Sequence, residues 1–455
     1  TLFHKAPGEL ENPGPMAQEI SVSPSNLNSF QASGSVESTA MRKIRRRILP
    51  FVFILYVVAF LDRANVAYAK LEMSKQLGFS EAVYGFGAGL FFAGYLLLEI
   101  PGGLIVQKWG ARRWFARILL SWGLCTTLTG FIHTATHFYV ARFVLGVAEA
   151  GFFPGVIVYL NQWFPSKYRG RAMARFVMAI PVSLAFGGPI SGLILKLSWF
   201  GLPGWRWVFL LEGIPAMVLG VMTLYYLTDR PQQANWLTPE EIGWVNQELE
   251  EEKKKKRALA KLTIFQAFRQ RPVIVLSLMT FFINIGGQGF YLWLPSTVQK
   301  ASGYSAQMAS IVSGLPFAMG IVSLLLFSWS SDRLQERYWH TALPLTLGGC
   351  FFILTAIPSL SFGWLLILLC MTSFFIYGFI PSYWVLTTMS LSESAAAAAV
   401  GFINCFTALG GFLGPTLIGN MLSFGIPFTG VIFLIASCYV VAGSLTFALK
   451  RSSHP

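Results

Sequence analysis

Twelve separate stretches of the chain are long and apolar enough to cross a lipid bilayer, and this feature constrains the fold more than any other. The hydrocarbon core of a bilayer is about 30 Å thick, so a helix needs roughly 20 apolar residues to span it. The composition agrees, because 12% of the residues are charged, whereas soluble chains usually carry about a quarter. We therefore predict an all-α membrane protein with twelve transmembrane helices. The stretches lie near 48–69, 82–106, 113–132, 138–163, 172–197, 206–228, 273–298, 304–329, 341–360, 363–388, 396–423 and 428–449.

The apolar stretches form two groups of six, separated by the one long polar stretch inside the chain. Within that stretch, a run of Glu residues is followed by a run of Lys residues, and their i,i+4 pairs favour a solvated helix. A contact with anionic lipid is the alternative interpretation. The first residues are rich in Ser, Pro and Gly without periodicity, which is typical of disorder. The predicted parts are a disordered tail (1–41), a six-helix bundle (42–228), a cytoplasmic linker with a charged helix (229–271), a second bundle (272–450) and a C-terminal tail (451–455).

Basic residues are distributed unequally between the two sides of the membrane. If the N-terminus is cytoplasmic, 27 of the 34 Lys and Arg residues lie in cytoplasmic segments. This asymmetry predicts that both termini of a multi-pass inner-membrane protein are cytoplasmic. The net charge of +14 is spread as short clusters between apolar stretches, so it does not indicate a nucleic-acid partner. We expect a monomer surrounded by lipid.

The two groups of six stretches show signs of an internal repeat. Gln107 and Asp332 are 225 residues apart, as are Arg112 and Arg337. Pro189 and Pro415, each after Gly in a Gly-Pro pair, are 226 residues apart. Repeats of this kind place a substrate site at the interface of the two halves, near the middle of the membrane.

Four ionisable residues within the predicted spans indicate where the chemistry lies. They are Asp62 and Arg63 in the first span, and Arg142 and Glu149 in the fourth. Charges inside a membrane are costly and usually face a cavity or a partner. An Arg side chain can bind a carboxylate through two parallel hydrogen bonds, and a nearby carboxyl group can take up a proton when that cation is occupied. The pattern predicts a proton-coupled site for a small organic anion, whereas structural ion pairs between helices are the alternative.

Polar and aromatic residues near the middle of other spans are further candidates for the substrate site, although packing is the alternative for each. Glu99 precedes Pro101 in the second span, where we expect it to brace the cytoplasmic gate. The five Cys residues lie in apolar stretches without metal-ligand spacing, and no cluster of nucleophilic residues suggests an enzyme. We therefore predict no catalytic or metal site. The substrate-site candidates of this group are Tyr95, Asn284, Gln288, Tyr291, Tyr383, Trp384 and Asn404.

Several motifs resemble a known family. The segments GGLIVQKWGARR (102–113) and SSDRLQERY (330–338) resemble the two loop signatures of the major facilitator superfamily. FLDRAN (60–65) and ARFVLGVAEAGFFPG (141–155) resemble its anion:cation symporter family. TDRPQQANWLTPEE (228–241) resembles the linker of the branch that takes tartrate, phthalate and hydroxyphenylacetate. The resemblance implies the major facilitator fold, two pseudo-symmetric six-helix bundles.

The resemblance also implies roles for individual residues. Arg63 would bind the substrate carboxylate, Asp62 and Glu149 would carry the coupled proton, Arg142 would pair with Glu149, and Tyr95 would line the cavity. Two positions depart from the family pattern, because Gln107 replaces the usual Asp and the 407–411 stretch lacks a usual Asn. The residues that would close the cytoplasmic gate in the outward-facing state are Gln107, Arg112, Arg113, Asp332, Arg333 and Arg337.

Together these features predict import of a dicarboxylate, aromatic acid or sugar acid by proton symport through alternating access, without a cofactor. The apolar face near Ile180 and Pro181 favours a compact dicarboxylate or aromatic acid over a long sugar acid. A proton antiporter that exports a drug or metabolite is the first alternative. The Arg residues within the spans disfavour the lipophilic cations that many exporters carry. A non-transporting membrane sensor or a membrane enzyme is a remote alternative.

Overall fold

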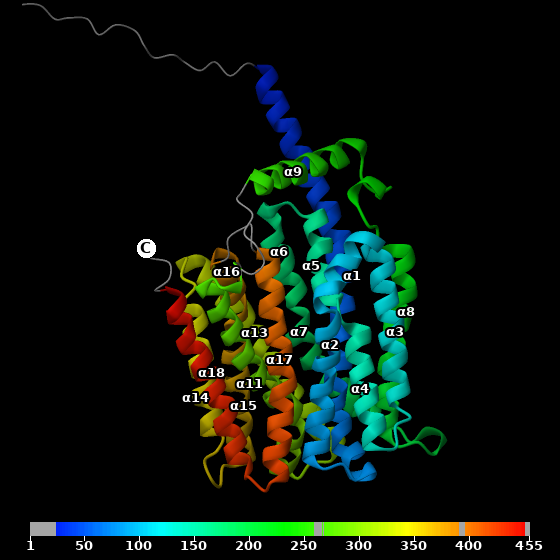
Figure 1. The fold of residues 1–455 in the computed structure, drawn as a ribbon, viewed down its shortest axis with the longest axis vertical. Helices are drawn as coiled ribbons and strands as arrows, with labels where there is room; N and C mark the ends of the chain where they lie inside the picture. Colours follow the sequence, from blue (N-terminus) through cyan, green and yellow to red (C-terminus); the bar gives the residue numbers. More distant parts are fainter. Residues whose placement is uncertain (1–23, 259–265, 267, 391–395, 451–455) are drawn as a thin grey trace, which may run out of the picture.

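The computed structural model describes residues 24–258, 266, 268–390 and 396–450, and the regular structure of these residues is helical. Twelve segments, each made of one helix or of two consecutive helices, run along the bundle (Figure 1), and nine of these described segments are long and apolar enough to cross a membrane. The twelve segments are α1 (Pro24–Leu77), α2 (Glu81–Trp109), α3 (Ala111–Thr129), α4 (Ala135–Glu149) with α5 (Phe152–Trp163), α6 (Ser166–Val177) with α7 (Ala179–Ile194), α8 (Gly204–Tyr226), α11 (Arg271–Ser302), α12 (Ala306–Val312) with α13 (Gly314–Leu334), α14 (Trp339–Leu354), α15 (Phe362–Gly378) with α16 (Ile380–Ser390), α17 (Ala396–Ser423) and α18 (Phe428–Lys450).

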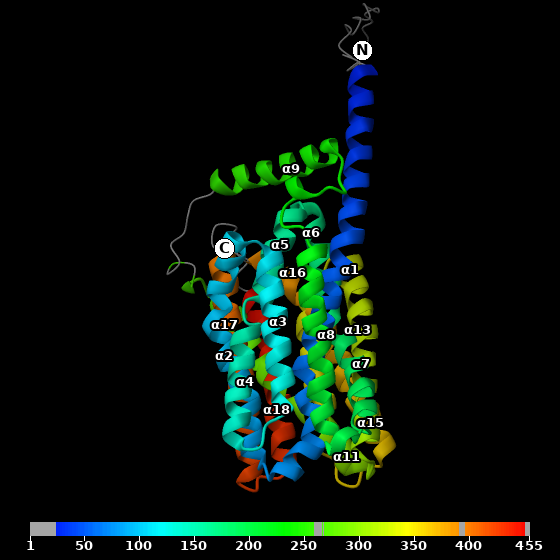
Figure 2. The same ribbon diagram turned by 90° about the vertical axis from the view of Figure 1, so that its right-hand side faces the viewer.

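The linker helix α9 (Pro239–Ala258) defines one end of the bundle, which we call the linker side. The first residue of α1 and the last residue of α18 both lie on this side (Figures 1 and 2). The helix lies across the first half, where Arg169 of α6 contacts Glu252 at 2.8 Å. The indole rings of Trp163 and Trp236 stack nearby, with centroids 5.3 Å apart. The linker is therefore packed against the first six-helix half.

Helix α1 extends well beyond the membrane on the linker side. Its described part begins at Pro24, which differs from the disordered tail predicted for residues 1–41. The extension is held because Lys43 pairs with Glu241 of α9 at 2.8 Å, and Glu37 accepts hydrogen bonds from Lys167 and Tyr168. Residues 1–23 lie outside the described residues.

The two halves, α1–α8 and α11–α18, meet mainly through α2 with α17, α7 with α12 and α13, and α1 with α11. Figure 1 shows α17 beside α2 along this boundary. Glycines allow the helices to approach closely there. A Cβ atom on Gly85 would lie 2.2 Å from the Pro415 carbonyl oxygen, and one on Gly188 would lie 2.3 Å from the Ser310 carbonyl oxygen. Both glycines lie toward the end of the bundle that is opposite the linker.

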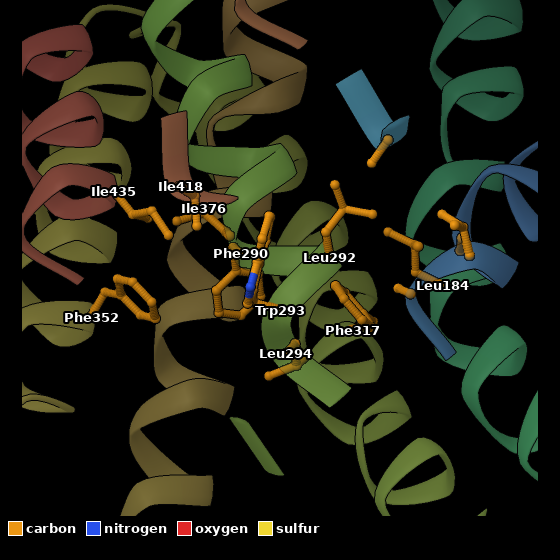
Figure 3. Packing of buried hydrophobic residues seen from close by; sticks show 14 of the residues in the cluster. Leu184, Phe290, Leu292, Trp293, Leu294, Phe317, Phe352, Ile376, Ile418 and Ile435 are labelled. Carbon is orange, nitrogen blue, oxygen red and sulfur yellow. The ribbon is translucent and has the colours of Figure 1, made fainter. Parts of the chain in front are cut away.

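Buried apolar residues form two clusters with different positions. One cluster joins both halves and includes Tyr84 and Leu184 of the first half. From the second half it includes Phe290, Trp293 and Ile418, which Figure 3 shows together with Leu184. The other cluster lies within the first half and the linker segment. Part of the interface between the halves is therefore a packed apolar cluster that includes Trp293.

A break in the fourth crossing segment lies next to a predicted functional residue. Helix α4 ends at Glu149, and α5 begins two residues beyond Ala150. Gly151 has φ 82°, in the left-handed region that favours glycine. A Cβ atom on Gly102 of α2 would lie 2.4 Å from the Gly151 Cα, so α2 packs directly against this break. The break sets the direction in which the last residue of α4 points.

Candidate functional site

A cavity of about 260 Å³ lies between the two halves. Eight of the predicted substrate-site residues line it, from α1, α2, α11, α16 and α17. They are Arg63, Tyr95, Asn284, Gln288, Tyr291, Tyr383, Trp384 and Asn404. This is the position that an interface between two repeats favours for a substrate site.

Among the described residues that line this cavity, Arg63 is the only Arg or Lys. Its Nε donates a hydrogen bond to Glu149 Oε1 at 2.6 Å. The guanidinium also lies over the rings of Phe60 and Tyr95, at 5.0 and 5.1 Å from their centroids. Aromatic faces of this kind stabilise a desolvated cation. One ion pair and several rings therefore hold a positive charge at the cavity wall.

Arg142 does not form the predicted ion pair with Glu149, so that prediction is wrong. Glu149 instead binds Arg63 of α1. The two residues of α4 are seven positions apart, which separates them by about 10.5 Å along the helix axis. Arg142 is 2% exposed and does not line the cavity, and its guanidinium lies over Phe91 at 5.0 Å. Its Nε and Nη1 atoms are buried and have no hydrogen-bond partner in the described part of the chain.

Asp62 points away from the cavity although it precedes Arg63. Its carboxylate is 1% exposed and accepts hydrogen bonds from Thr126 Oγ1 and from Asn65 Nδ2, at 2.5 and 2.8 Å. Successive residues of a helix point about 100° apart, so one faces the interior of the first half while the other reaches the cavity. The structure thus separates two residues that the sequence places together.

Glu99, which we expected to brace the cytoplasmic gate, is one of the residues that line the cavity. Its Oε1 accepts a hydrogen bond from Asn404 Nδ2 at 3.0 Å, and this bond joins the two halves. The Oε2 atom is buried without a hydrogen-bond partner. Glu99 therefore supplies a carboxylate at the cavity itself, whereas Glu149, which binds Arg63, is buried and does not line the cavity.

Several aromatic cavity residues were not predicted from the sequence. They are spaced from the predicted residues by whole helical turns. Tyr56 and Phe60 lie seven and three residues before Arg63, and Phe92 lies three residues before Tyr95. Positions i, i+3, i+4 and i+7 share one helix face, so this spacing was the signal that could have identified them. Cavity residues outside the predicted set are Tyr56, Phe60, Phe92, Phe153, Val177, Thr280, Ile283, Phe379, Ile380, Ile403, Thr407 and Ala408.

Three of the predicted gate residues make side-chain contacts within the second half. Asp332 pairs with Arg337 at 2.8 Å, and Arg333 lies over the Trp329 ring. The backbone N–H of Arg112 donates to Asp229 at 2.7 Å. Apart from Glu99, no described gate side chain forms a hydrogen bond or ion pair with a described residue of the other half. The Gln107 side chain lies outside the described part.

Most hydrogen bonds between the halves lie at the end opposite the linker. Trp293 Nε1 donates to Glu81 Oε2 at 2.9 Å, and the backbone N–H of Ala82 donates to Ser423 Oγ at 2.8 Å. Lys70 pairs with the same Glu81 oxygen at 2.7 Å. The cavity is thus closed on that side by packed helices and polar contacts.

The described residues contain no group of three or more His, Cys, Asp or Glu side chains that could hold a metal ion. The polar groups of the described residues that line the cavity are a guanidinium, one carboxylate (Glu99), amides and hydroxyls. This set can bind an anionic group and exchange a proton with it.

Comparisons with known proteins place these features in context. The family model described as Major Facilitator Superfamily matches residues 52–415. A protein named "Putative tartrate transporter" from Agrobacterium vitis is 41% identical, over 96% of this chain and 97% of its own length. A "Quinolone resistance transporter" from Acinetobacter baumannii is 37% identical, over 84% of this chain and 88% of its own. These relatives are transporters, which confirms that the chain is not of an enzyme family.

A solved structure supports the fold. The crystal structure of a bacterial homolog to the human lysosomal transporter Spinster, inward-facing and unoccupied, has a TM-score of 0.73 with 17% sequence identity. The similarity covers 90% of this chain and 97% of that chain. The prediction of a twelve-helix fold built from two bundles is confirmed by this match and by the family model.

Proposed function

Because the chain belongs to the Major Facilitator Superfamily, we propose that it is a secondary transporter that imports a small organic carboxylate together with a proton. The observation that carries this proposal is the ion pair between Arg63 and Glu149 at the wall of a cavity between the halves. Arg63 supplies a cationic site, and Glu149 supplies a group that can take up a proton. The two residues meet at one point, so binding of the acid and of the proton can depend on each other.

The cavity wall suggests which acids fit. One carboxylate of the substrate binds Arg63 through a fork of two hydrogen bonds, the geometry that guanidinium offers. The second half contributes amide and hydroxyl groups, such as Asn284 and Gln288, but no charged side chain. Rings such as Phe153 and Trp384 contact the rest of the molecule. The acid that fits this wall best is compact, with one carboxylate bound by Arg63, an aromatic or short polar body and few charges. The name of the Agrobacterium vitis relatives also supports an organic acid.

Coupling follows from competition for Arg63. When the substrate carboxylate binds the guanidinium, Glu149 loses its hydrogen-bonded cation while it stays 1% exposed. A buried carboxylate without a paired cation is costly, and a proton from the aqueous side removes its charge. When the substrate leaves, Glu149 releases this proton and binds Arg63 again. One proton thus accompanies each carboxylate.

Alternating access requires that each side of the cavity closes in turn. The side opposite the linker is closed by α2 with α17 and by α7 with α12. In the other state, these contacts separate and the linker side closes. With the termini in the cytoplasm, the first state releases substrate into the cell and the second receives it from outside.

Uptake into proteoliposomes tests the proposal. The purified protein, reconstituted with a fixed internal pH, is given radiolabelled tartrate, phthalate, hydroxyphenylacetate or an aldonate with the outside acidic or at equal pH. We expect at least one acid to accumulate, faster with the acidic outside. Glu149→Gln should abolish this dependence on the gradient, whereas Glu72→Gln, outside the cavity, should preserve it. Accumulation that ignores the gradient in the unaltered protein contradicts proton symport.

Export of a drug or metabolite in exchange for protons is the second candidate. The 37% identity to the quinolone resistance transporter supports it, as do the many aromatic residues of the cavity. Everted vesicles distinguish the two functions, because an exporter accumulates quinolone when the vesicle interior is acidified. Failure of quinolone to accumulate, together with uptake of an organic acid into proteoliposomes, favours the importer.

A further inference from the structure

A second cavity, of about 610 Å³, lies on the linker side of the first half. It is separate from the cavity between the halves and is formed where α1, the turn between α2 and α3, the end of α8 and the segment before α9 meet. The linker packing described above forms one of its walls. Its lining residues are mostly polar and aromatic, and three of them are arginines, Arg47, Arg112 and Arg113.

The three arginines of this cavity have no ion-pair partner among the described residues. Asp229 is the only acidic residue in the described part of the lining. Its Oδ1 accepts the backbone N–H of Arg112 at 2.7 Å, so this carboxylate caps the start of α3. A negative group at a helix start is stabilised by the helix dipole. The cavity therefore keeps an excess of positive charge.

Two of the arginines also have buried nitrogen atoms that lack partners. The Nε atoms of Arg47 and Arg112 are buried without a hydrogen-bond acceptor in the part of the chain that the structure describes. The Arg47 guanidinium lies over the rings of Tyr226 and Trp236, at 4.9 and 5.3 Å from their centroids. Its position is thus set by rings rather than by a carboxylate. Such donors are arranged for an anion from outside the chain.

The cavity lies where lipid headgroups are expected. Trp109 and Tyr225, which line it, are 59% and 84% exposed, and exposed apolar residues such as Val221 and Met222 of α8 precede it along the helix. Trp and Tyr are enriched where the membrane surface meets water. The exposed face of α8 therefore faces lipid, and the cavity opens at the level of the headgroups.

We propose that this cavity binds the phosphate of an anionic phospholipid in the linker-side leaflet. Arginine forks match phosphate oxygens, and basic pockets between helices at a membrane surface bind such headgroups. The lipid would join α1, which carries both Arg47 and Arg63, to the linker segment at Trp236. The site rests on the packing of α1, α3, α8 and the linker, and does not depend on which substrate the protein carries.

Binding of short-chain lipids to the purified full-length protein in detergent tests this site. The probes are dioctanoyl phosphatidylglycerol, dioctanoyl phosphatidylcholine and inorganic phosphate. The affinity of the protein for each probe is measured by isothermal titration calorimetry. The test variant is R47Q/R112Q/R113Q, and the matched control is R46Q/R171Q/R175Q, whose three arginines are exposed and line neither cavity. R113Q alone changes one exposed side chain, so it retains the fold if the triple variant does not.

We expect the unaltered protein and the control to bind phosphatidylglycerol in preference to phosphatidylcholine. The test variant should bind it on the order of tenfold more weakly or worse, because charge-assisted hydrogen bonds are lost. Equal binding by the test variant and the control would overturn the site. Inorganic phosphate that binds as tightly as the lipid, and displaces it, would overturn the lipid in favour of a soluble phosphate compound.

Discussion

Arg63 Nε donates to Glu149 Oε1 at 2.6 Å, and this bond joins the middle of α1 to the last residue of α4. The Arg63 side chain is 13% exposed at the cavity, whereas the Glu149 side chain is 1% exposed. A substrate in the cavity can therefore reach the cation directly, whereas the carboxylate behind it stays buried away from the cavity.

Arg63→Lys should weaken substrate binding by roughly ten- to a hundredfold, because hydrogen bonds to charged groups are worth about 1.5–3 kcal/mol. Lysine keeps the charge but cannot offer two parallel hydrogen bonds to a carboxylate. Isothermal titration with the transported acid measures the change. The matched control is Arg175→Lys on the exposed surface of α6. An unchanged affinity in Arg63→Lys would exclude this residue as the carboxylate site.

Glu149→Gln should separate substrate exchange from proton movement. The amide cannot gain or lose a charge, so exchange of internal for external substrate should continue while uptake no longer responds to a pH gradient. Counterflow and gradient-driven uptake, measured on the same proteoliposomes, report the two properties. If both properties remain, another group carries the proton.

Gly85→Leu should prevent the end opposite the linker from closing. A Cβ atom at this position would already lie 2.2 Å from the Pro415 carbonyl oxygen, so a larger side chain separates α2 from α17. We expect transport to be lost and a cysteine introduced at the buried Leu292 to become reactive toward a water-soluble thiol reagent, in a background without native cysteines. Gly170→Leu, where a Cβ meets nothing within 4 Å, is the control. An unreactive Leu292→Cys in the Gly85 variant would contradict this account.

The contact between α1 and the linker should weaken in acid. Burial raises the pKa of Glu241, but hydrogen bonds from Lys43 and from the Thr238 backbone lower it more, so its pKa lies below the ordinary value of 4.5. A lowered pKa in the folded state contributes stability above pH 4.5, and this contribution is lost as the pH falls through the lower folded-state pKa.

This effect is measured as the midpoint temperature of thermal unfolding. The pH is varied between pH 3 and pH 7 in steps of roughly one unit, a range that includes the ordinary pKa of Glu. Glu241→Gln should lower the midpoint at neutral pH and reduce its decline in acid. Glu248→Gln, an exposed residue of the same helix, should leave the profile unchanged. Identical profiles for the Glu241 variant and the unaltered protein would show that the pair with Lys43 does not contribute.

Much of the candidate site could be predicted because a polar side chain in a membrane span is costly unless it faces a cavity or a partner. Arg63, Asn284 and Gln288 stand out in otherwise apolar stretches, and all three line the cavity. The aromatic residues of the cavity were harder to predict, because a residue such as Phe60 or Phe153 in a membrane helix is equally expected to face lipid. Glu99 was expected at a gate because of its place near Pro101, yet it lies at the cavity and binds Asn404.

The amino-acid sequence by itself determined that the chain crosses the membrane twelve times and which charged residues must lie within the spans. These properties depend on length and on the cost of placing charge in lipid, both of which act along the chain. Only the tertiary structure decided which charges meet. Glu149 pairs with Arg63, 86 residues away, and leaves Arg142 of its own helix unpaired. Such pairings depend on how packed helices are rotated and where α4 breaks at Gly151, and no local pattern encodes either.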